Sequence, residues 1–170
     1  LGYGYGISVT PLQLARAYSV LANGGRVLPV SLLRHETLPE GERVMSEQTA
    51  RQVRGMLEQA VSQDGTGVAA QVAYYRVGGK TGTAHNLVNG EYAKNSYIAS
   101  FAGFAPASNP RLVMIITVDE PQGSAYYGGQ VAAPVFSKVM AGALRLLNIP
   151  PDNLNAPARR TAELGRGGVT

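Results

Sequence analysis

A cation, two hydroxyl groups and a glycine occupy consecutive positions near the middle of the chain. Residues 79–84 read Gly-Lys-Thr-Gly-Thr-Ala and follow a short apolar lead-in. On a β-strand, Thr81 and Thr83 lie on one face and Lys80 on the other, because successive side chains alternate. Two hydroxyls on one face can bind one carboxylate, and the ammonium group can supply positive potential beside a nucleophile. This stretch therefore predicts a binding strand at the edge of a cleft.

The same residues could instead be the end of a phosphate-binding P-loop. That motif requires a glycine five residues before Gly79 and a helix directly after the Lys-Thr pair. The chain has Tyr74 at the first of these positions, and Gly82 and strand-like residues follow the pair. The sequence therefore argues against a phosphate site.

A second candidate is the Lys-Thr-Gly strand of penicillin-interacting serine enzymes. Gly82, with no side chain, would let a ligand backbone lie against the strand and pair with it as an added strand. The amide of Thr83 could then donate a hydrogen bond to an oxyanion. The competing interpretation is an ordinary exposed edge strand, on which Lys80 guards against aggregation. The motif alone leaves both interpretations open.

The order of the helices and strands expected around this strand predicts an α+β fold, with helices packed on an antiparallel sheet. A capping box at Thr10 and Gln13 begins a helix over residues 11–22. Apolar periodicity predicts two more helices, at about 47–62 and 134–147, and one further turn is expected over 68–72, after the first of these. The predicted strands cover roughly residues 75–85, 96–105 and 111–119, after a β-leaning segment at 26–33.

Burial and connections follow from the same pattern. Residues 112–116 are all apolar, which predicts a central strand buried on both faces. Residues 86–92 are expected to form a loop between the first two strands, and residues 121–129 a glycine-rich loop. The apolar positions of the last helix predict its buried side, which comprises Val135, Phe136, Val139, Met140, Ala143, Leu144 and Leu147.

Length and composition limit the function classes. The chain has 170 residues, 45% of them hydrophobic, and a formal net charge of +4, which fits one globular domain. Residues 152–170 lack periodic apolar positions, are expected to be disordered and carry Arg159, Arg160 and Arg166, so nucleic-acid binding gains little support. The absence of cysteine excludes disulfides and thiol catalysis. The longest aliphatic run, residues 112–118, is too short to span a membrane.

Other residue types that could do chemistry have weaker contexts. His35 lies in a polar loop and is expected to be solvated. Asp119 and Glu120 end a strand, where adjacent side chains point to opposite faces, so they are not expected to form a catalytic carboxylate pair. Tyr3 and Tyr5 alternate with glycines and are interpreted as structural.

Several segments resemble class B penicillin-binding proteins, in the order in which that family has them. Within the class, the resemblance is to the septal peptidoglycan D,D-transpeptidases of Gram-negative cell division, and it runs from about residue 1 to 153. The long first segment is highly specific, and the shorter ones support it by their order. The matching segments are residues 2–16, 41–44, 79–84, 102–107, 126–129 and 133–136.

The resemblance implies part of the penicillin-binding-protein transpeptidase fold, which is similar to that of serine β-lactamases. Residues 1–151 would be the C-terminal part of the transpeptidase domain, and residues 152–170 a disordered tail. The chain contains no Ser-x-x-Lys tetrad and no Ser-x-Asn triad. The family's nucleophilic serine is therefore expected upstream of Leu1, and the chain alone is expected to be inactive.

The resemblance also implies roles for residues of the motif. Lys80 would add positive charge near the nucleophile and the substrate carboxylate, which Thr81 and Thr83 would bind by hydrogen bonds. The Thr83 amide would help to hold the oxyanion, and Gly82 would permit close approach.

Residues outside the strand also acquire implied roles. Tyr126 and Tyr127 would form an aromatic wall of the acyl pocket, although packing onto the last helix is an alternative for them. His85 would rim the cleft rather than act as a base. No metal and no cofactor is implied.

The implied reaction is acyl transfer through a serine acyl-enzyme, with D-Ala-D-Ala stem peptides as substrates and β-lactams as inhibitors. The implied partners are a septal glycosyltransferase and other division proteins, and the implied location is the periplasmic side of the bacterial inner membrane. The motif is shared with D,D-carboxypeptidases and β-lactamases, and a penicillin-sensing or scaffold domain that binds without turnover is a further alternative. The segment at residues 2–16 favours the transpeptidase.

Overall fold

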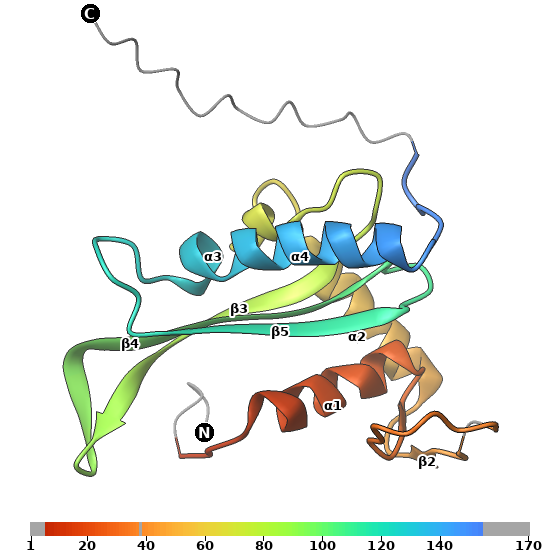
Figure 1. The fold of residues 1–170 in the computed structure, drawn as a ribbon, viewed down its shortest axis with the longest axis horizontal. Coiled ribbons are helices and arrows are strands. Elements are labelled where there is room, and N and C mark those ends of the chain that lie inside the picture. The colour runs from red at the N-terminus through yellow and green to blue at the C-terminus, as the bar shows by residue number, and fades with distance from the viewer. Residues whose placement is uncertain (1–5, 38, 155–170) are drawn as a thin grey trace, which may run out of the picture.

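Three antiparallel strands form the sheet around which the molecule is built. The computed structural model describes residues 6–37 and 39–154. Strands β3 (Gly78–Val88), β4 (Glu91–Ala105) and β5 (Leu112–Asp119) pair in the order β3-β4-β5. Figure 1 shows the two longest strands extending together well beyond the helices at one end. The Lys-Thr-Gly stretch lies in β3, so the expected edge strand is confirmed.

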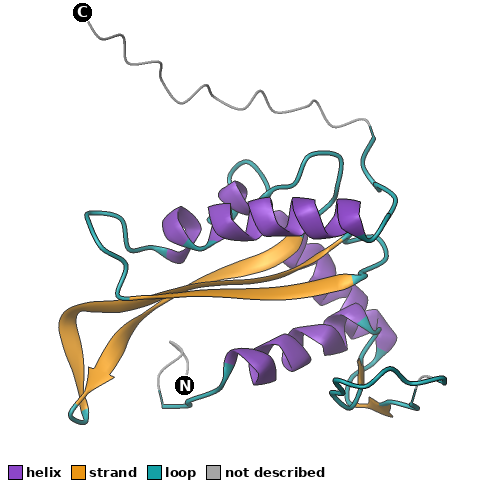
Figure 2. Cartoon of the chain, in the orientation of Figure 1, coloured by secondary structure: helices purple, strands orange, loops and turns teal. Residues whose placement is uncertain are grey.

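Helices cover both faces of this sheet. Helix α1 (Pro11–Ala22) lies on one side, and α4 (Ala133–Leu146) lies on the other with the short α3 (Gly128–Val131). Helix α2 (Glu47–Gln59) contacts both α1 and β3, and a 3-10 turn, η1 (Val68–Ala70), contacts α4. Figure 2 shows the resulting arrangement of helix, sheet and helix layers. The predicted α+β class with helices flanking an antiparallel sheet is confirmed.

The helix starts follow from local hydrogen bonding. At α1, the Gln13 amide donates to Thr10 Oγ1 at 3.2 Å and the Thr10 amide donates to Gln13 Oε1 at 2.8 Å. At α2, the Thr49 amide donates to Ser46 Oγ at 2.9 Å. These bonds satisfy amides that the first helical turn leaves without a partner. Both predicted N-termini are confirmed.

The core lies between the sheet and α4. Phe101 of β4 meets Phe136 of α4 edge to face, with ring centroids 4.7 Å apart. Phe136, Met140 and Leu144 are fully buried, and each such side chain contributes about 1.5–3 kcal/mol of hydrophobic stabilisation. Their spacing of four residues places them on one stripe of the helix.

The predicted buried side of the last helix was too wide. Val135, Val139 and Leu147 were expected in the core, yet they are 41%, 49% and 60% exposed. The stripe through Phe136 and Leu144 alone faces the sheet, because one helix presents only a limited arc to a flat surface. Apolar residues on both flanks of that stripe therefore remain at the surface.

The prediction that β5 is central was wrong. Strand β4 is central, and β5 is the other edge of the sheet in the described part of the chain. Both α1 and α4 contact β5, which explains why apolar residues continue along it without alternation. A strand whose two faces are covered by helices can still lie at the edge of a sheet. Residues 112–116 are each only half-buried, so the predicted burial on both faces is incomplete.

The loop expected at residues 86–92 is also wrong, because the strands continue through it. Strand β3 ends at Val88, β4 begins at Glu91, and only Asn89 and Gly90 turn the chain. Both turn residues have positive φ, 52° and 85°, as a tight two-residue hairpin requires. The Asn-Gly pair by itself indicates a two-residue turn, and the prediction of a longer loop did not use this signal.

A small lobe lies apart from the main sheet. Strand β1 (Arg26–Val27) pairs with β2 (Glu42–Arg43), so only the start of the β-leaning segment at 26–33 is a strand.

The predicted loop at 121–129 is also shorter than expected, because α3 begins at Gly128.

The ordered chain continues into the predicted tail. The carboxylate of Asp152 accepts hydrogen bonds from the amides of Arg76 at 2.7 Å and Ser108 at 3.1 Å, and the Asn153 amide donates to Tyr74 O at 3.0 Å. Residues 152 and 153, which were expected to belong to a disordered tail, therefore make defined hydrogen bonds. Residues 155–170 lie outside the described part of the chain.

In the described residues, no helix is both long and apolar enough to cross a membrane.

Candidate functional site

Strand β3 presents the motif at an open edge of the sheet. It pairs with β4 on one side, Thr81 opposite Phe101 and Gly82 opposite Ser100. No other strand of the described residues pairs with its outer edge. Because paired residues share a face, Thr81 and Thr83 point to the face that carries Phe101 and α4, and Lys80 points to the opposite face. The predicted phases of the motif follow from this register.

Lys80 bends back to the strand edge, although its side chain starts on the opposite face. Its Nζ donates to the carbonyl of Thr81 at 2.9 Å and to Thr81 Oγ1 at 3.3 Å. Lys80 is exposed, so the charge remains in contact with solvent. The ammonium group and the Thr81 hydroxyl therefore meet at one point on the edge, despite their opposite phases.

A third hydroxyl joins this point from a loop. Thr66 Oγ1 lies 3.1 Å from Thr81 Oγ1. Thr66 follows the end of α2 in a turn where Gly67 packs against the Phe101 ring, a Cβ there meeting Phe101 Cε2 at 3.1 Å. Sequence reasoning places Thr66 only in the connection after the predicted helix at about 47–62. A threonine flanked by Gly65 and Gly67 was the available signal, because glycines on both sides permit close backbone approach.

The Thr83 hydroxyl is held by the start of α3. The amide of Gly128 donates to Thr83 Oγ1 at 3.1 Å. A Cβ at Gly128 would lie 2.2 Å from Ser100 O and 2.5 Å from Gly82 O. Gly128 is therefore seated directly on the backbones of β3 and β4, and only glycine fits there.

Gly82 faces the opposite side of the sheet, where it opposes Ser100. A Cβ added at Gly82 would meet Ser100 Oγ at 2.5 Å. That contact is with the end of a side chain that can rotate, whereas the contacts of Gly128 are with backbone. Because Gly82 has no side chain, the backbone of β3 is accessible next to Lys80, as close approach of a ligand requires.

Four rings form a continuous row from the hairpin to the loop after β5. Tyr126 stacks on Tyr97 of β4 at 4.3 Å, and the ring centroids of Tyr126 and Tyr127 are 4.4 Å apart. His85 lies 4.7 Å from Tyr97 on its other side, and His85 Nδ1 is 2.7 Å from Ala93 O. The tyrosine pair thus packs on the β3–β4 hairpin and not on the last helix, and its role as an aromatic wall of the acyl pocket stays a prediction.

Tyr127 is 53% exposed at the end of this row. Tyr126 Oη donates to Tyr127 Oη at 3.2 Å, and this hydrogen bond is the main cause that raises the pKa of Tyr126 above its ordinary value. The Tyr126 hydroxyl is accordingly neutral at physiological pH. The row offers an apolar surface whose exposed end carries two tyrosine hydroxyl groups.

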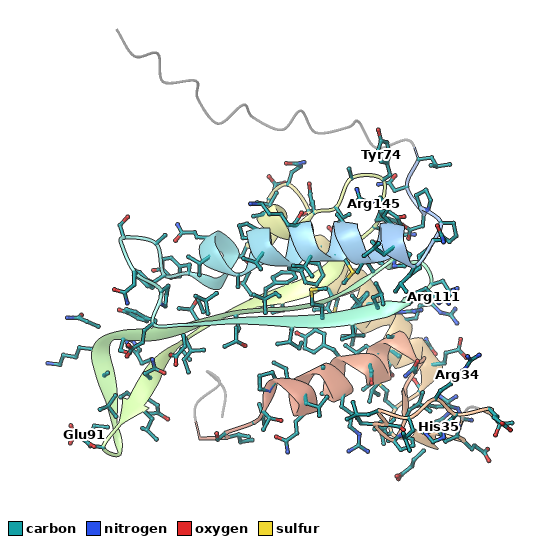
Figure 3. The ribbon with its side chains drawn as sticks, viewed as in Figure 1. Arg34, His35, Tyr74, Glu91, Arg111 and Arg145 are labelled. Carbon is teal, nitrogen blue, oxygen red and sulfur yellow. The ribbon has the colours of Figure 1, made fainter. Side chains whose placement is uncertain are left out.

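The remaining sequence candidates lie elsewhere. His35 lies in the lobe between β1 and β2, far from β3 (Figure 3), and is exposed. Tyr3 and Tyr5 fall outside the described residues. In the described part of the chain, no three His, Asp or Glu side chains converge on a point that could hold a metal ion.

Asp119 and Glu120 behave differently from the expectation. Glu120 has a φ of 47°, so the chain leaves the extended conformation there and both carboxylates enter one hydrogen-bonded cluster. Asp119 Oδ1 accepts from Asn86 Nδ2 at 2.9 Å, and Glu120 Oε1 accepts from Ser96 Oγ at 2.8 Å. Strand alternation does not extend to Glu120, because β5 ends at Asp119, and the expectation that the two carboxylates form no catalytic pair stays a prediction.

The sequence and the fold together define a family. The family model described as "Penicillin binding protein transpeptidase domain" matches residues 1–141. The chain belongs to this family. Its fold is similar to that of the apo transpeptidase domain of penicillin-binding protein 3 from Burkholderia pseudomallei, with a TM-score of 0.82 and 49% sequence identity. The match covers 91% of this chain and 46% of that one.

Two curated relatives give the level of similarity. The probable peptidoglycan D,D-transpeptidase PenA of Neisseria meningitidis (serogroup A / serotype 4A) is 48% identical over 162 residues, which cover 95% of this chain and 28% of PenA. The peptidoglycan D,D-transpeptidase FtsI of Escherichia coli (strain K12) is 42% identical over 166 residues, which cover 97% of this chain and 28% of FtsI. The chain thus spans under a third of the length of these relatives.

Proposed function

We propose that this chain forms the C-terminal part of a peptidoglycan D,D-transpeptidase. The observation that carries the proposal is the open-edged strand β3, where Lys80, Thr81 and Thr83 gather a cation and two hydroxyls beside a glycine. The names of PenA and FtsI, which match nearly the whole chain, support the same reaction. The nucleophilic serine would come from residues outside this chain, and acylation would split the transfer into two easier steps.

The carboxylate of a D-Ala-D-Ala stem peptide or of a β-lactam would bind at the hydroxyls. An ammonium group only donates hydrogen bonds, so Thr81 Oγ1 acts as the acceptor for Lys80 Nζ. One of the two hydroxyls, Thr81 or Thr66, donates the hydrogen bond that joins them, and the other can donate a hydrogen bond to a ligand. The Thr83 oxygen already accepts from Gly128, so its proton is available as well. The edge therefore provides two hydroxyl donors and a nearby positive charge for one carboxylate.

The oxyanion of the reaction would bind at the strand edge. The Thr81 carbonyl accepts Lys80 Nζ, which places it on the outer side of β3. In an antiparallel strand the amide and carbonyl of one residue point the same way and alternate residues share that direction. The Thr83 amide is thus expected on the same outer edge, where it can donate to an oxyanion.

The ring row would line the acyl pocket. Tyr126 and Tyr127 supply the apolar wall, and Tyr97 supports them from behind. His85 lies at the far end of the row and would rim the cleft without acting as a base. The wall would contact the acyl side chain of the donor peptide or of a β-lactam.

In a complete protein, the reaction would cross-link stem peptides during septal cell-wall synthesis. The similarity to FtsI supports a role in division. A septal glycosyltransferase and other division proteins would then be its partners. The substrate places this part of the protein in the periplasm, on a chain anchored in the inner membrane. β-Lactams would inhibit it as trapped acyl-enzymes.

The test is acylation by a fluorescent penicillin, followed by denaturing electrophoresis. The complete protein, meaning this chain together with the upstream part of the domain, should be labelled covalently. Substitution Lys80→Ala should lower the acylation rate by about 10²–10³-fold, as expected for loss of a key electrostatic group. Lys138→Ala, which removes an exposed lysine on α4, is the matched control and should label normally.

Two results would contradict the proposal. One is covalent labelling of the 170-residue chain by itself, because the nucleophile would then lie within it. The other is normal labelling of Lys80→Ala in a protein that folds. Rapid release of the label would instead identify a β-lactamase or carboxypeptidase, in which water attacks the acyl-enzyme.

A further inference from the structure

A polar cluster joins residues within β3 and β4 to the end of β5, on the side of the sheet away from the hydroxyls. We call Asn86, Ser96, Asp119 and Glu120 the strand-end cluster. Asn86 Nδ2 donates to Ser96 Oγ at 2.8 Å and to Asp119 Oδ1 at 2.9 Å, and Ser96 Oγ donates to Glu120 Oε1 at 2.8 Å. Ser96 is therefore the link between β3 and the residue that follows β5.

Glu120 is fixed at a conformation that side-chain-bearing residues rarely adopt. Its φ of 47° lies in the left-handed region, which is strained for a residue other than glycine. Its amide donates to Tyr97 O at 2.9 Å, and its carbonyl accepts from Gln122 Nε2 at 2.9 Å. Such a conformation persists only where surrounding bonds hold it, and the bond from Ser96 is one of them.

The segment that starts at Glu120 leads to the tyrosine pair. Tyr97, which binds the Glu120 amide through its carbonyl, also carries the ring on which Tyr126 stacks at 4.3 Å. The far end of the segment is held where the Gly128 amide binds Thr83. Both ends of residues 120–128 are thus attached to the β3–β4 hairpin, and the strand-end cluster sets the angle at which the segment departs.

From this we propose that Ser96 and Glu120 are positioning residues for the aromatic wall. They touch neither the hydroxyl site nor the tyrosine rings, and they act by fixing the start of the 120–128 segment. Their loss lets Tyr126 and Tyr127 shift relative to Thr83, which weakens binding of a ligand side chain while the chemistry at Lys80 remains intact. This role rests on the proposed acyl-transfer function of the site.

The first experiment measures the segment itself, independently of activity. Hydrogen exchange of the Glu120 amide, which donates to Tyr97 O at 2.9 Å, is followed by mass spectrometry of the peptide that contains it, in the complete protein and in the Ser96→Ala variant. Exchange is expected to be ~10-fold faster in the variant, because local opening reports the bonds that close a segment. Ser96→Thr restores the hydroxyl and should restore protection. Ser108→Ala and Glu91→Gln, the latter at the hairpin tip (Figure 3), are controls that should change nothing.

The second experiment measures acylation by two penicillins, one with an aromatic acyl side chain and one with no acyl side chain. Ser96→Ala should reduce the rate constant for the aromatic compound by ~10-fold and that for the bare nucleus by less than ~2-fold, since misplaced contacts lower rates. Equal losses for both compounds, or unchanged exchange of the Glu120 amide, would overturn the proposal. If the parent protein is not acylated at all, the proposed function fails, and the exchange result still decides the positioning role.

Discussion

Thr81 Oγ1 lies between two partners, and this determines what the hydroxyl can offer a ligand. Lys80 Nζ is 3.3 Å away and Thr66 Oγ1 is 3.1 Å away. The lysine can only donate, so the Thr81 hydroxyl is free to donate its own hydrogen bond either to Thr66 Oγ1 or to a bound carboxylate. Thr66 is thus part of the hydroxyl arrangement, although it is 15 residues from Thr81 in sequence.

The variant Thr66→Val tests this at the residue scale. Valine has the shape of threonine without its hydroxyl, so the fold should lose no more than ~1 kcal/mol, the net value of an exposed hydrogen bond. Acylation by a penicillin that bears a carboxylate should fall ~3–10-fold, because one charge-assisted donor is lost or misdirected. The comparison is Thr37→Val, an exposed threonine between β1 and β2. Unchanged acylation in Thr66→Val would remove Thr66 from the site.

The site residues that sequence reasoning identified are those whose chemistry is local. Lys80, Thr81 and Thr83 follow one another, and strand alternation alone predicts their faces. Thr66 and Tyr97 were missed because their relation to the motif is created by folding, through a turn against Phe101 and a ring stack on Tyr126. No local pattern in the sequence encodes such contacts between distant segments.

At the scale of elements, glycines determine how closely β3 meets its neighbours. A Cβ at Gly79 would lie 2.4 Å from Phe101 Cζ, and a Cβ at Gly78 would lie 2.5 Å from Phe104 Cζ. Gly128 has equally close backbone neighbours, whereas Gly82 meets only a serine hydroxyl. The neighbours of β3 therefore pack directly against its backbone at the glycine positions. Gly82 differs, because it faces only the Ser100 side chain.

Two alanine substitutions should separate packing from ligand approach. Gly128→Ala is expected to destabilise the protein by ~1–3 kcal/mol, because its Cβ overlaps backbone atoms that cannot rotate away. Gly82→Ala should cost less than ~1 kcal/mol, because Ser100 can change rotamer. Urea unfolding of the complete protein measures both. Equal stability losses in the two variants would contradict this distinction.

The elements themselves were largely predictable where signals are local and strong. The capping box at Thr10 and the cap at Ser46 fixed the starts of two helices correctly. The hairpin was underestimated, because turn-forming residues around Asn89-Gly90 were interpreted as a loop although the pair alone suffices for the turn. The position of β5 in the sheet depends on which strands pair, and an apolar run cannot report this.

At the scale of the whole molecule, the sheet has two edges that differ in character. The edge at β3 carries Lys80 and polar side chains, which discourage pairing with another chain. The edge at β5 carries the half-buried apolar run 112–116 and has no charged side chain until Asp119. An exposed apolar edge is a template for strand pairing, so the two edges should behave differently in solution.

The 170-residue chain alone is therefore expected to self-associate through β5. Size-exclusion chromatography with light scattering should show dimers or larger species at concentrations of about 100 μM, a range in which transiently exposed edges aggregate. Thr117→Lys, at an exposed position of β5, should shift the chain toward monomer, while Thr37→Lys in the lobe should not. A monomeric parent chain would show that the β5 edge does not pair.

The close packing of Gly128 against the backbones of β3 and β4 also limits how this protein can evolve. Selection by an antibiotic favours substitutions that alter binding but keep the fold, and added bulk at Gly79 or Gly128 meets atoms within 2.5 Å. Gly90 at the hairpin turn and Gly123 in the 120–128 segment have open space around them, but their φ values of 85° and 98° would strain any other residue there. Inherited changes in drug affinity should therefore accumulate at the residues around these glycines, in the hairpin and in that segment, leaving the glycines and the strand unaltered.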